Sequence, residues 1–354
     1  MLPFPITYAP RVCSVNIPVS IIFLSIALIL ISYFNMANNS HSVPVPAEPP
    51  SDFHFKYTVL KGYFMQSEDS TDDTTFDFKK SNFGLINRTY PTDTPSSSSH
   101  QWKRFETHIR SLAKDDNIKV LWLGRHGQGW HNVAESKYGT KAWDCYYSAL
   151  NGADNITWSD AHLTPTGSSQ ALAVHDLWAQ QLPNGIPMPD KFIVSPLTRT
   201  IETADLTFQG LSLPYQPYIK ELVREVLGIH TCDRRSTLTH LTSTYPHLTF
   251  EPNFSDPDLL WETNYREPLD ARKYRLATFL DDVFAHESGV FVSMTSHSGA
   301  IASMLDVVGH REFQLETGGV ICVVVRAERV EGKREVPERG PSDGPEMCDG
   351  PPGV

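Results

Sequence analysis

The sequence has 354 residues, of which 40% are hydrophobic, and its formal net charge is −11 at pH 7. This composition is typical of a globular protein with a sizeable core. The acidic charge excludes the dominant basic surface of a nucleic-acid binder, so we expect no nucleic-acid partner. The five cysteines lack the spacing of zinc ligands, which indicates buried or incidental thiols. The sequence predicts no metal and no other cofactor, and it does not indicate an oligomeric state.

An apolar segment lies near the N-terminus. Ile17–Phe34 carries no charge and is about long enough to span a bilayer. Arg11 precedes it and no Lys or Arg follows until Lys56, which favours a cytosolic N-terminus. We therefore expect residues 1–36 to be a single-pass membrane anchor or a signal segment, with the following domain lumenal or extracellular. If translation starts at Met36, the alternative is a cytoplasmic protein.

The segments on either side of the central region are polar. Residues 37–52 are rich in proline and predict a linker, while residues 328–354 are rich in Gly, Pro and charge and predict a disordered tail. The folded domain is expected at 53–327. Asn-x-Ser/Thr sequons, which fit a lumenal or secreted domain, occur at Asn38, Asn87, Asn155 and Asn253.

Short apolar runs alternate with longer helical patterns within this domain. The predicted strands are Ile118–Leu123, Lys191–Val194, Val290–Thr295 and Val320–Arg326. The predicted helices are Thr166–Gln181, Arg199–Phe208, Pro268–His286 and Ser298–Val308. Such alternation indicates βαβ units. The expected fold is an α/β three-layer sandwich, with a mostly parallel central sheet and helices on both faces.

Chemically reactive side chains follow three of the four predicted strands. Arg125 and His126 come after the first, Arg199 after the second and His297 after the third. Ligands of open α/β sheets bind beyond the carboxyl ends of the strands, so these side chains are expected to converge there.

This set of residues fits the chemistry of a phosphoryl group. Arg125 and Arg199 each offer a planar fork of donors that matches phosphate oxygens. A neutral imidazole at His126 can attack phosphorus and form a covalent intermediate. His297 would bind another phosphoryl oxygen and hold charge in the transition state.

Departure of an alkoxide also requires an acid, for which three glutamates are candidates. Glu225 is our choice. Glu221 is a competitor that is equally well explained as a surface carboxylate, and Glu202 falls within a predicted helix and is expected on its solvated face.

Four segments together resemble a known family. They are residues 123–132 (LGRHGQGWHN), 160–167 (DAHLTPTG), 195–204 (SPLTRTIETA) and 292–299 (VSMTSHSG). They resemble, in order, the motifs of the histidine phosphatase superfamily, whose fold is phosphoglycerate mutase-like. The resemblance implies that His126 is phosphorylated, that Arg125, Arg199 and His297 form the phosphate pocket, that Glu225 is the proton donor and that Asn132 contacts substrate.

The resemblance extends to the fungal phosphomutase-like branch of broad phosphatases, through residues 222–236, 55–64 and 83–92. The sequence departs from glycolytic mutases after His126 and around Glu225, where the E-R-x-Y-G run is missing. We therefore expect a metal-independent phosphomonoester hydrolase of the histidine acid phosphatase type that acts on a small phosphorylated substrate. A phosphoglycerate-type mutase and a non-catalytic phospho-ligand binding module are the alternatives.

Overall fold

The computed structural model describes residues 52–352 of the chain. The strands are β1 (Phe53–Val59), β2 (Ile118–Arg125), β3 (Gly152–Ala153), β4 (Ile156–Thr157), β5 (Lys191–Val194), β6 (Pro217–Ile219), β7 (Thr249–Phe250), β8 (Phe291–Ser296) and β9 (Val320–Glu331). The α-helices are α2 (Gln101–Leu112), α3 (Trp130–Tyr138), α4 (Thr140–Cys145), α5 (Pro165–Gln181), α6 (Thr198–Phe208), α7 (Leu238–Thr244), α8 (Leu269–His286) and α9 (Ser298–Val307).

Seven strands form one sheet in the order β1-β9-β2-β8-β5-β6-β7. β9 runs antiparallel to both of its neighbours, while the pairs from β2 to β7 are parallel. β3 and β4 form a separate hairpin. The mostly parallel sheet predicted from the sequence is confirmed.

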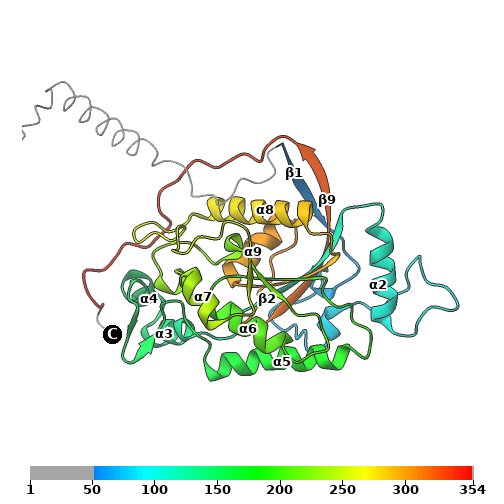
Figure 1. Ribbon diagram of the computed structural model, residues 1–354, viewed down its shortest axis with the longest axis horizontal. Coiled ribbons are helices and arrows are strands. Elements are labelled where there is room, and N and C mark those ends of the chain that lie inside the picture. The colour runs from blue at the N-terminus through cyan, green and yellow to red at the C-terminus, as the bar shows by residue number, and fades with distance from the viewer. Residues whose placement is uncertain (1–51, 353–354) are drawn as a thin grey trace, which may run out of the picture. The chain divides into compact units, whose positions relative to one another are not determined.

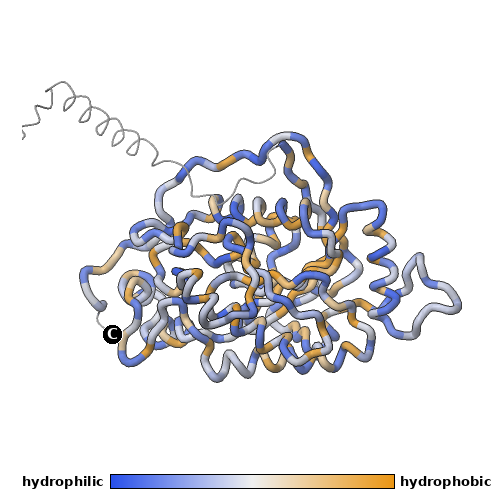
Figure 2. Tube along the Cα trace, in the orientation of Figure 1, coloured by the Kyte–Doolittle hydropathy of each residue, from blue (hydrophilic) through white to orange (hydrophobic). Residues whose placement is uncertain are grey.

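Helices cover both faces of the sheet, as Figure 1 shows. Side chains alternate between the faces along a strand, so in β2 Leu121 and Leu123 join the core under α8 and α9. Val120 and Trp122 join an aromatic-rich core with α2 and α5 on the other face. In Figure 2 the apolar colour follows the strands between these two layers. The three-layer arrangement is therefore also confirmed.

The elements predicted from the sequence all exist, with ends that shift by a few residues. Local chemistry explains the start of α5, where the side chain of Thr164 accepts a hydrogen bond from the backbone of Gly167 and Pro165 takes the first helical position. This helix start matters for function, because it lies against the loop that follows β2.

The predicted membrane location is wrong, because no helix within residues 52–352 is long and apolar enough to cross a membrane. The longest of these helices is α8, whose 18 residues include charged side chains such as Asp270 and Lys273. A bilayer core requires about 20 mainly apolar residues. Ile17–Phe34, on which the prediction rested, lies outside the described residues.

The C-terminal segment differs from the expected disordered tail. β9 continues to Glu331, and Arg334 then forms an ion pair of 2.8 Å with the buried Asp281. Further along, Arg339 pairs with Glu262 at 2.9 Å. A disulfide joins Cys348 to Cys145 at the end of α4. Ion pairs and a covalent link thus hold a segment that has few apolar side chains.

Candidate active site

The carboxyl ends of β2, β8 and β5 meet at one edge of the sheet. Arg125 is in register with Ser296, and the backbone of His126 donates to the carbonyl of Ser296 at 3.0 Å. This pairing brings the ring centroids of His126 and His297 to 5.2 Å from each other. The structure therefore brings the two histidines together as the sequence predicts.

His126 is buried in a fixed orientation, with only 2% of its surface exposed. Its Nδ1 lies 2.7 Å from the carbonyl oxygen of Gly127. A carbonyl can only accept, so Nδ1 carries the proton and Nε2 has the lone pair. Burial, followed by the charge of Arg199, holds the pKa of His126 well below its ordinary value. The ring is therefore neutral near pH 7.

Gly127 permits this arrangement by having no side chain. A Cβ at this position would lie 2.8 Å from the carbonyl carbon of Gly167, at the start of α5. The backbone of Gly127 also donates to Oγ1 of Thr203 at 3.0 Å. Close packing of α5 and α6 against the loop thus fixes the position of His126.

His297 is fully buried at the start of α9. Its Nε2 lies 2.8 Å from Oγ of Ser195, and its Nδ1 is buried without a partner among the described residues. Burial and then the charge of Arg199 hold the pKa of His297 well below its ordinary value. The imidazole is therefore neutral in the free pocket.

Two arginines provide the positive charge of the site. Nη1 of Arg199 donates to the carbonyl of Cys232 at 2.6 Å and Nη2 to Oδ1 of Asp233 at 2.9 Å. Nη1 of Arg125 donates to the carbonyl of Leu315 at 2.7 Å. The Nε atoms of both arginines are buried without a partner in the described part of the chain. Arg125 also lines an open cleft of about 730 Å³.

The three candidate acids lie in different surroundings. Oε2 of Glu225 accepts from the backbone of Gly299 at 3.0 Å, next to His297. Glu221 is buried in ion pairs with Arg224 and Arg235, at 2.7 and 2.9 Å. Glu202 holds the ring of His162 at 2.6 Å. Of the three, Glu225 lies beside the histidine pair.

Asn132 and His131 are adjacent in the first turn of α3. Oδ1 of Asn132 accepts from the backbone of Gly129 at 3.0 Å, so this side chain caps α3. His131 was not predicted as a site residue, yet its ring centroid lies 5.3 Å from that of His126. Burial, with Arg199 second, holds its pKa well below the ordinary value. The signal for His131 in the sequence was its position in the first turn of α3, directly after the loop that holds His126.

One group of potential metal ligands exists among residues 52–352, formed by His230, Cys232 and Asp233. Asp233 already pairs with Arg199 and, at 3.7 Å, with Arg266. Burial raises the pKa of the Cys232 thiol well above its ordinary value, whereas metal ligation requires a thiolate. Two adjacent cations and a protonated thiol make this group a poor cation site.

Residues 121–317, more than half of the chain, match the family described as Histidine phosphatase superfamily (branch 1), and the chain belongs to that family. The expected family and fold are confirmed.

The chain is 49% identical over 293 residues to "Probable phosphoglycerate mutase" of Arthroderma benhamiae, covering 80% of this chain and 88% of that protein. It is 37% identical over 275 residues to "Phosphomutase-like protein 3" of Candida albicans, covering 77% and 81%. The crystal structure of phosphoglycerate mutase from Bacillus anthracis matches 60% of this chain and 90% of its own, with 18% identity and a TM-score of 0.38.

Proposed function

We propose that the protein is a phosphomonoester hydrolase that acts without a metal ion and through a phosphohistidine at His126. The observation that carries this proposal is the state of the His126 ring. Nδ1 holds the proton that it donates to Gly127, and burial keeps the pKa low. Nε2 thus keeps its lone pair at neutral pH, as a nucleophile must.

The reaction has two steps. Nε2 of His126 attacks phosphorus, the ester P–O bond breaks, and Glu225 gives its proton to the leaving oxygen. Water then attacks the phosphorus of the phosphohistidine and passes a proton to Glu225, and the P–N bond breaks. Inorganic phosphate leaves, and both side chains return to their starting states.

Arg125, Arg199 and His297 are proposed to bind the equatorial oxygens of the phosphoryl group. The guanidinium groups supply positive charge next to His126, in surroundings that exclude most water. His297 supplies an N–H rather than a charge, because burial and Arg199 hold its pKa low.

Rapid quench of the full chain with labelled aryl phosphate tests the proposal. With EDTA present, we expect turnover and a protein-bound phosphoryl group that is labile in acid and stable in alkali, as a P–N bond is. His126→Ala should abolish both. His297→Ala should slow turnover by about 10²–10³ and still label. Dependence on added Mg²⁺ or Zn²⁺, or label remaining in His126→Ala, would contradict the mechanism.

A phosphoglycerate-type mutase is the second candidate, favoured by the name of the Arthroderma benhamiae relative. A mutase transfers the phosphoryl group back to the substrate, whereas a hydrolase transfers it to water. Incubation with 3-phosphoglycerate distinguishes the two. Free phosphate in excess of isomerised product supports hydrolysis, and the opposite ratio supports the mutase.

A further inference from the structure

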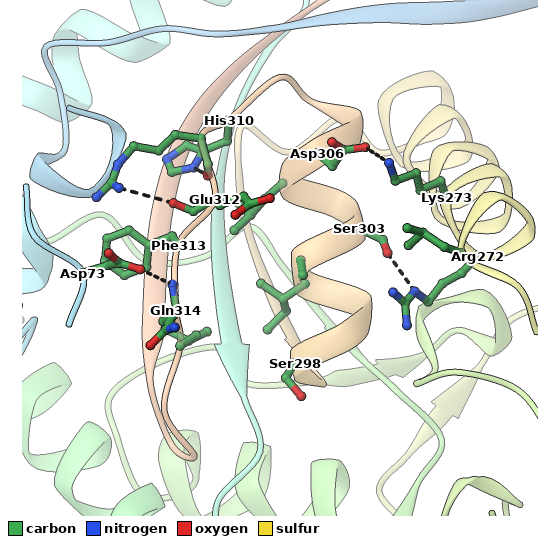
Figure 3. A pocket seen from close by; sticks show the side chains of 16 residues that line it. Asp73, Arg272, Lys273, Ser298, Ser303, Asp306, His310, Glu312, Phe313 and Gln314 are labelled. Atoms are coloured by element: carbon green, nitrogen blue, oxygen red, sulfur yellow. Dashed lines mark hydrogen bonds and ion pairs between the residues drawn. The ribbon is translucent and has the colours of Figure 1, made fainter. Parts of the chain in front are cut away.

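A cleft of about 690 Å³ extends along α9, and its lining includes Ser298 but none of the side chains assigned to the phosphoryl pocket. Ser298, directly after His297, lies at one end, and Asp306 lies on the last turn of the same helix. The start of α8 and residues 310–315 supply the remaining walls, together with Asp73 (Figure 3). The cleft therefore offers space for the part of a substrate beyond the ester oxygen.

Most charged groups of this cleft are already engaged. Lys273 pairs with Asp306 at 2.9 Å. The guanidinium of Arg311 donates to the backbone carbonyls of Gln66, Thr71 and Glu312. Asp73 accepts from the backbone of Gln314 at 2.7 Å. Burial lowers the pKa of His310 and favours its neutral form.

Arg272 is the exception among the cations that line the cleft. Within the described residues its side chain makes one hydrogen bond, from Nε to Oγ of Ser303 at 2.9 Å, as Figure 3 shows, and forms no ion pair with a carboxylate. Both Nη groups are thus available to donate. A partly buried guanidinium with two unused donors in one plane suits a carboxylate or a phosphate.

Arg272 also lies close to the proposed proton donor. A Cβ on Gly299 would lie 3.0 Å from Nη1 of Arg272 and would collide with Oε1 of Glu225. The two side chains therefore converge above the start of α9. Since Glu225 protonates the leaving oxygen in our mechanism, Arg272 faces the alcohol side of the ester bond.

We propose that Arg272 is a specificity residue that binds a second anionic group on the leaving alcohol, with the rest of that alcohol in the cleft along α9. The preferred substrates are then phosphomonoesters that carry a carboxylate or a further phosphate near the ester oxygen. This inference rests on the proposed hydrolysis, which fixes the position of the phosphoryl group at His126.

Two aryl phosphates of equal shape provide the test. 3-Carboxyphenyl phosphate has the second negative charge, and 3-carbamoylphenyl phosphate is its neutral counterpart. We expect the wild-type chain to prefer the carboxylate roughly 10- to 100-fold in kcat/KM, mainly through KM, as for a charge-assisted bidentate pair. Arg272→Met should remove most of that preference, and Arg272→Lys should retain part of it.

Lys273→Met is the matched control, because Lys273 is the adjacent cation in the same cleft and is already paired with Asp306. It should keep the wild-type preference. Equal rates for the two substrates in the wild-type chain would overturn the proposal. An equal loss on both substrates in Arg272→Met would also overturn it, since Arg272 would then act only on Glu225.

Binding measured by calorimetry separates this proposal from the proposed function. His126→Ala cannot turn over either substrate, so the affinities of both esters can be compared directly. We expect His126→Ala to bind the carboxylate ester more tightly than the neutral ester, and the His126→Ala, Arg272→Met double variant to lose this difference. That result supports the subsite even if the wild-type chain proves not to be a hydrolase. Equal affinities would contradict it.

Discussion

Oδ1 of Asp233 accepts a hydrogen bond from Nη2 of Arg199 at 2.9 Å, and both side chains are almost fully buried. The neighbouring carbonyl of Cys232 accepts from Nη1 of the same guanidinium. Residues 232 and 233 thereby fix the plane of Arg199 next to His126 and His297. Such fixed donors need no reorganisation when charge develops in a transition state.

Removal of the Asp233 carboxylate should therefore affect both stability and activity. Asp233→Ala leaves the buried Arg199 without its counter-ion, which typically costs about 3–5 kcal/mol in the free energy of unfolding. Asp233→Asn keeps an acceptor of the same shape and should retain more activity. Urea unfolding and steady-state kinetics measure the two effects. Inorganic phosphate should raise the melting temperature more in Asp233→Ala than in wild type, and an equal shift would contradict this account.

Glu225 and Glu221 should give different results when each is changed to Gln. Glu225→Gln removes the proposed acid, so alkyl phosphates, whose leaving groups need a proton, should lose roughly 10²–10⁴ in kcat. 4-Nitrophenyl phosphate should lose much less. Glu221→Gln removes charge opposite Arg224 and Arg235 and should mainly lower stability, by about 3 kcal/mol. Rates for both ester types and unfolding curves distinguish these roles, and a leaving-group dependence in Glu221→Gln would reverse the assignment.

Low pH should destabilise the fold through the buried histidines. Burial holds the pKa values of His126, His131 and His297 well below their ordinary value, while the unfolded rings bind protons near pH 6.5. The stabilisation is thus present above about pH 6.5. Each ring should lower the free energy of unfolding by roughly 1 kcal/mol per pH unit below that value. Urea unfolding from pH 8 to pH 5 measures the slope, which His131→Gln should reduce.

The same pKa shifts predict the acid limb of the rate profile. His126 stays neutral as the pH falls through 6.5, so kcat/KM for aryl phosphates should show no loss there that is attributable to the nucleophile. A fall in kcat/KM centred near pH 6.5 that coincides with protonation of the His126 ring in an NMR titration would mean that this ring has an ordinary pKa.

The link between Cys145 and Cys348 should stabilise the fold measurably. The two residues are 203 positions apart, and a bond that closes such a long loop typically contributes about 2–4 kcal/mol. Cys348→Ser, or dithiothreitol added to the wild-type chain, should lower the free energy of unfolding by that amount. Dithiothreitol should not change the Cys348→Ser variant further. Cys232 and Cys322 are buried free thiols. If dithiothreitol lowered the stability of Cys348→Ser further, another disulfide would have to exist.

Much of the fold could be predicted because its central strands are apolar runs with clear ends. β5 occupies the predicted Lys191–Val194, and β8 begins one residue after the predicted start. The short strands β6 and β7 could not be predicted, since they contain only three and two residues and have no periodicity. Their pairing depends on contacts with neighbouring strands.

The candidate site could be predicted to the extent that it follows strand ends. His126 and His297 come directly after β2 and β8, whose parallel pairing brings them together. Asp233 reaches Arg199 from the end of a short 3-10 helix, Thr231–Asp233, and no sequence pattern records such a contact. The Cys145–Cys348 pairing was missed for a related reason, because sequence spacing does not specify which cysteines meet.

The place of β9 in the sheet governs when this protein can fold during synthesis. β9 is the last strand of the described chain, yet it lies between β1 and β2, the first two, and bonds to both. Until the ribosome has released residues 320–331, β1 has no partner strand and β2 has an open edge. The β1 side of the sheet must therefore wait for β9, and until then these edges are open to other chains and to chaperones.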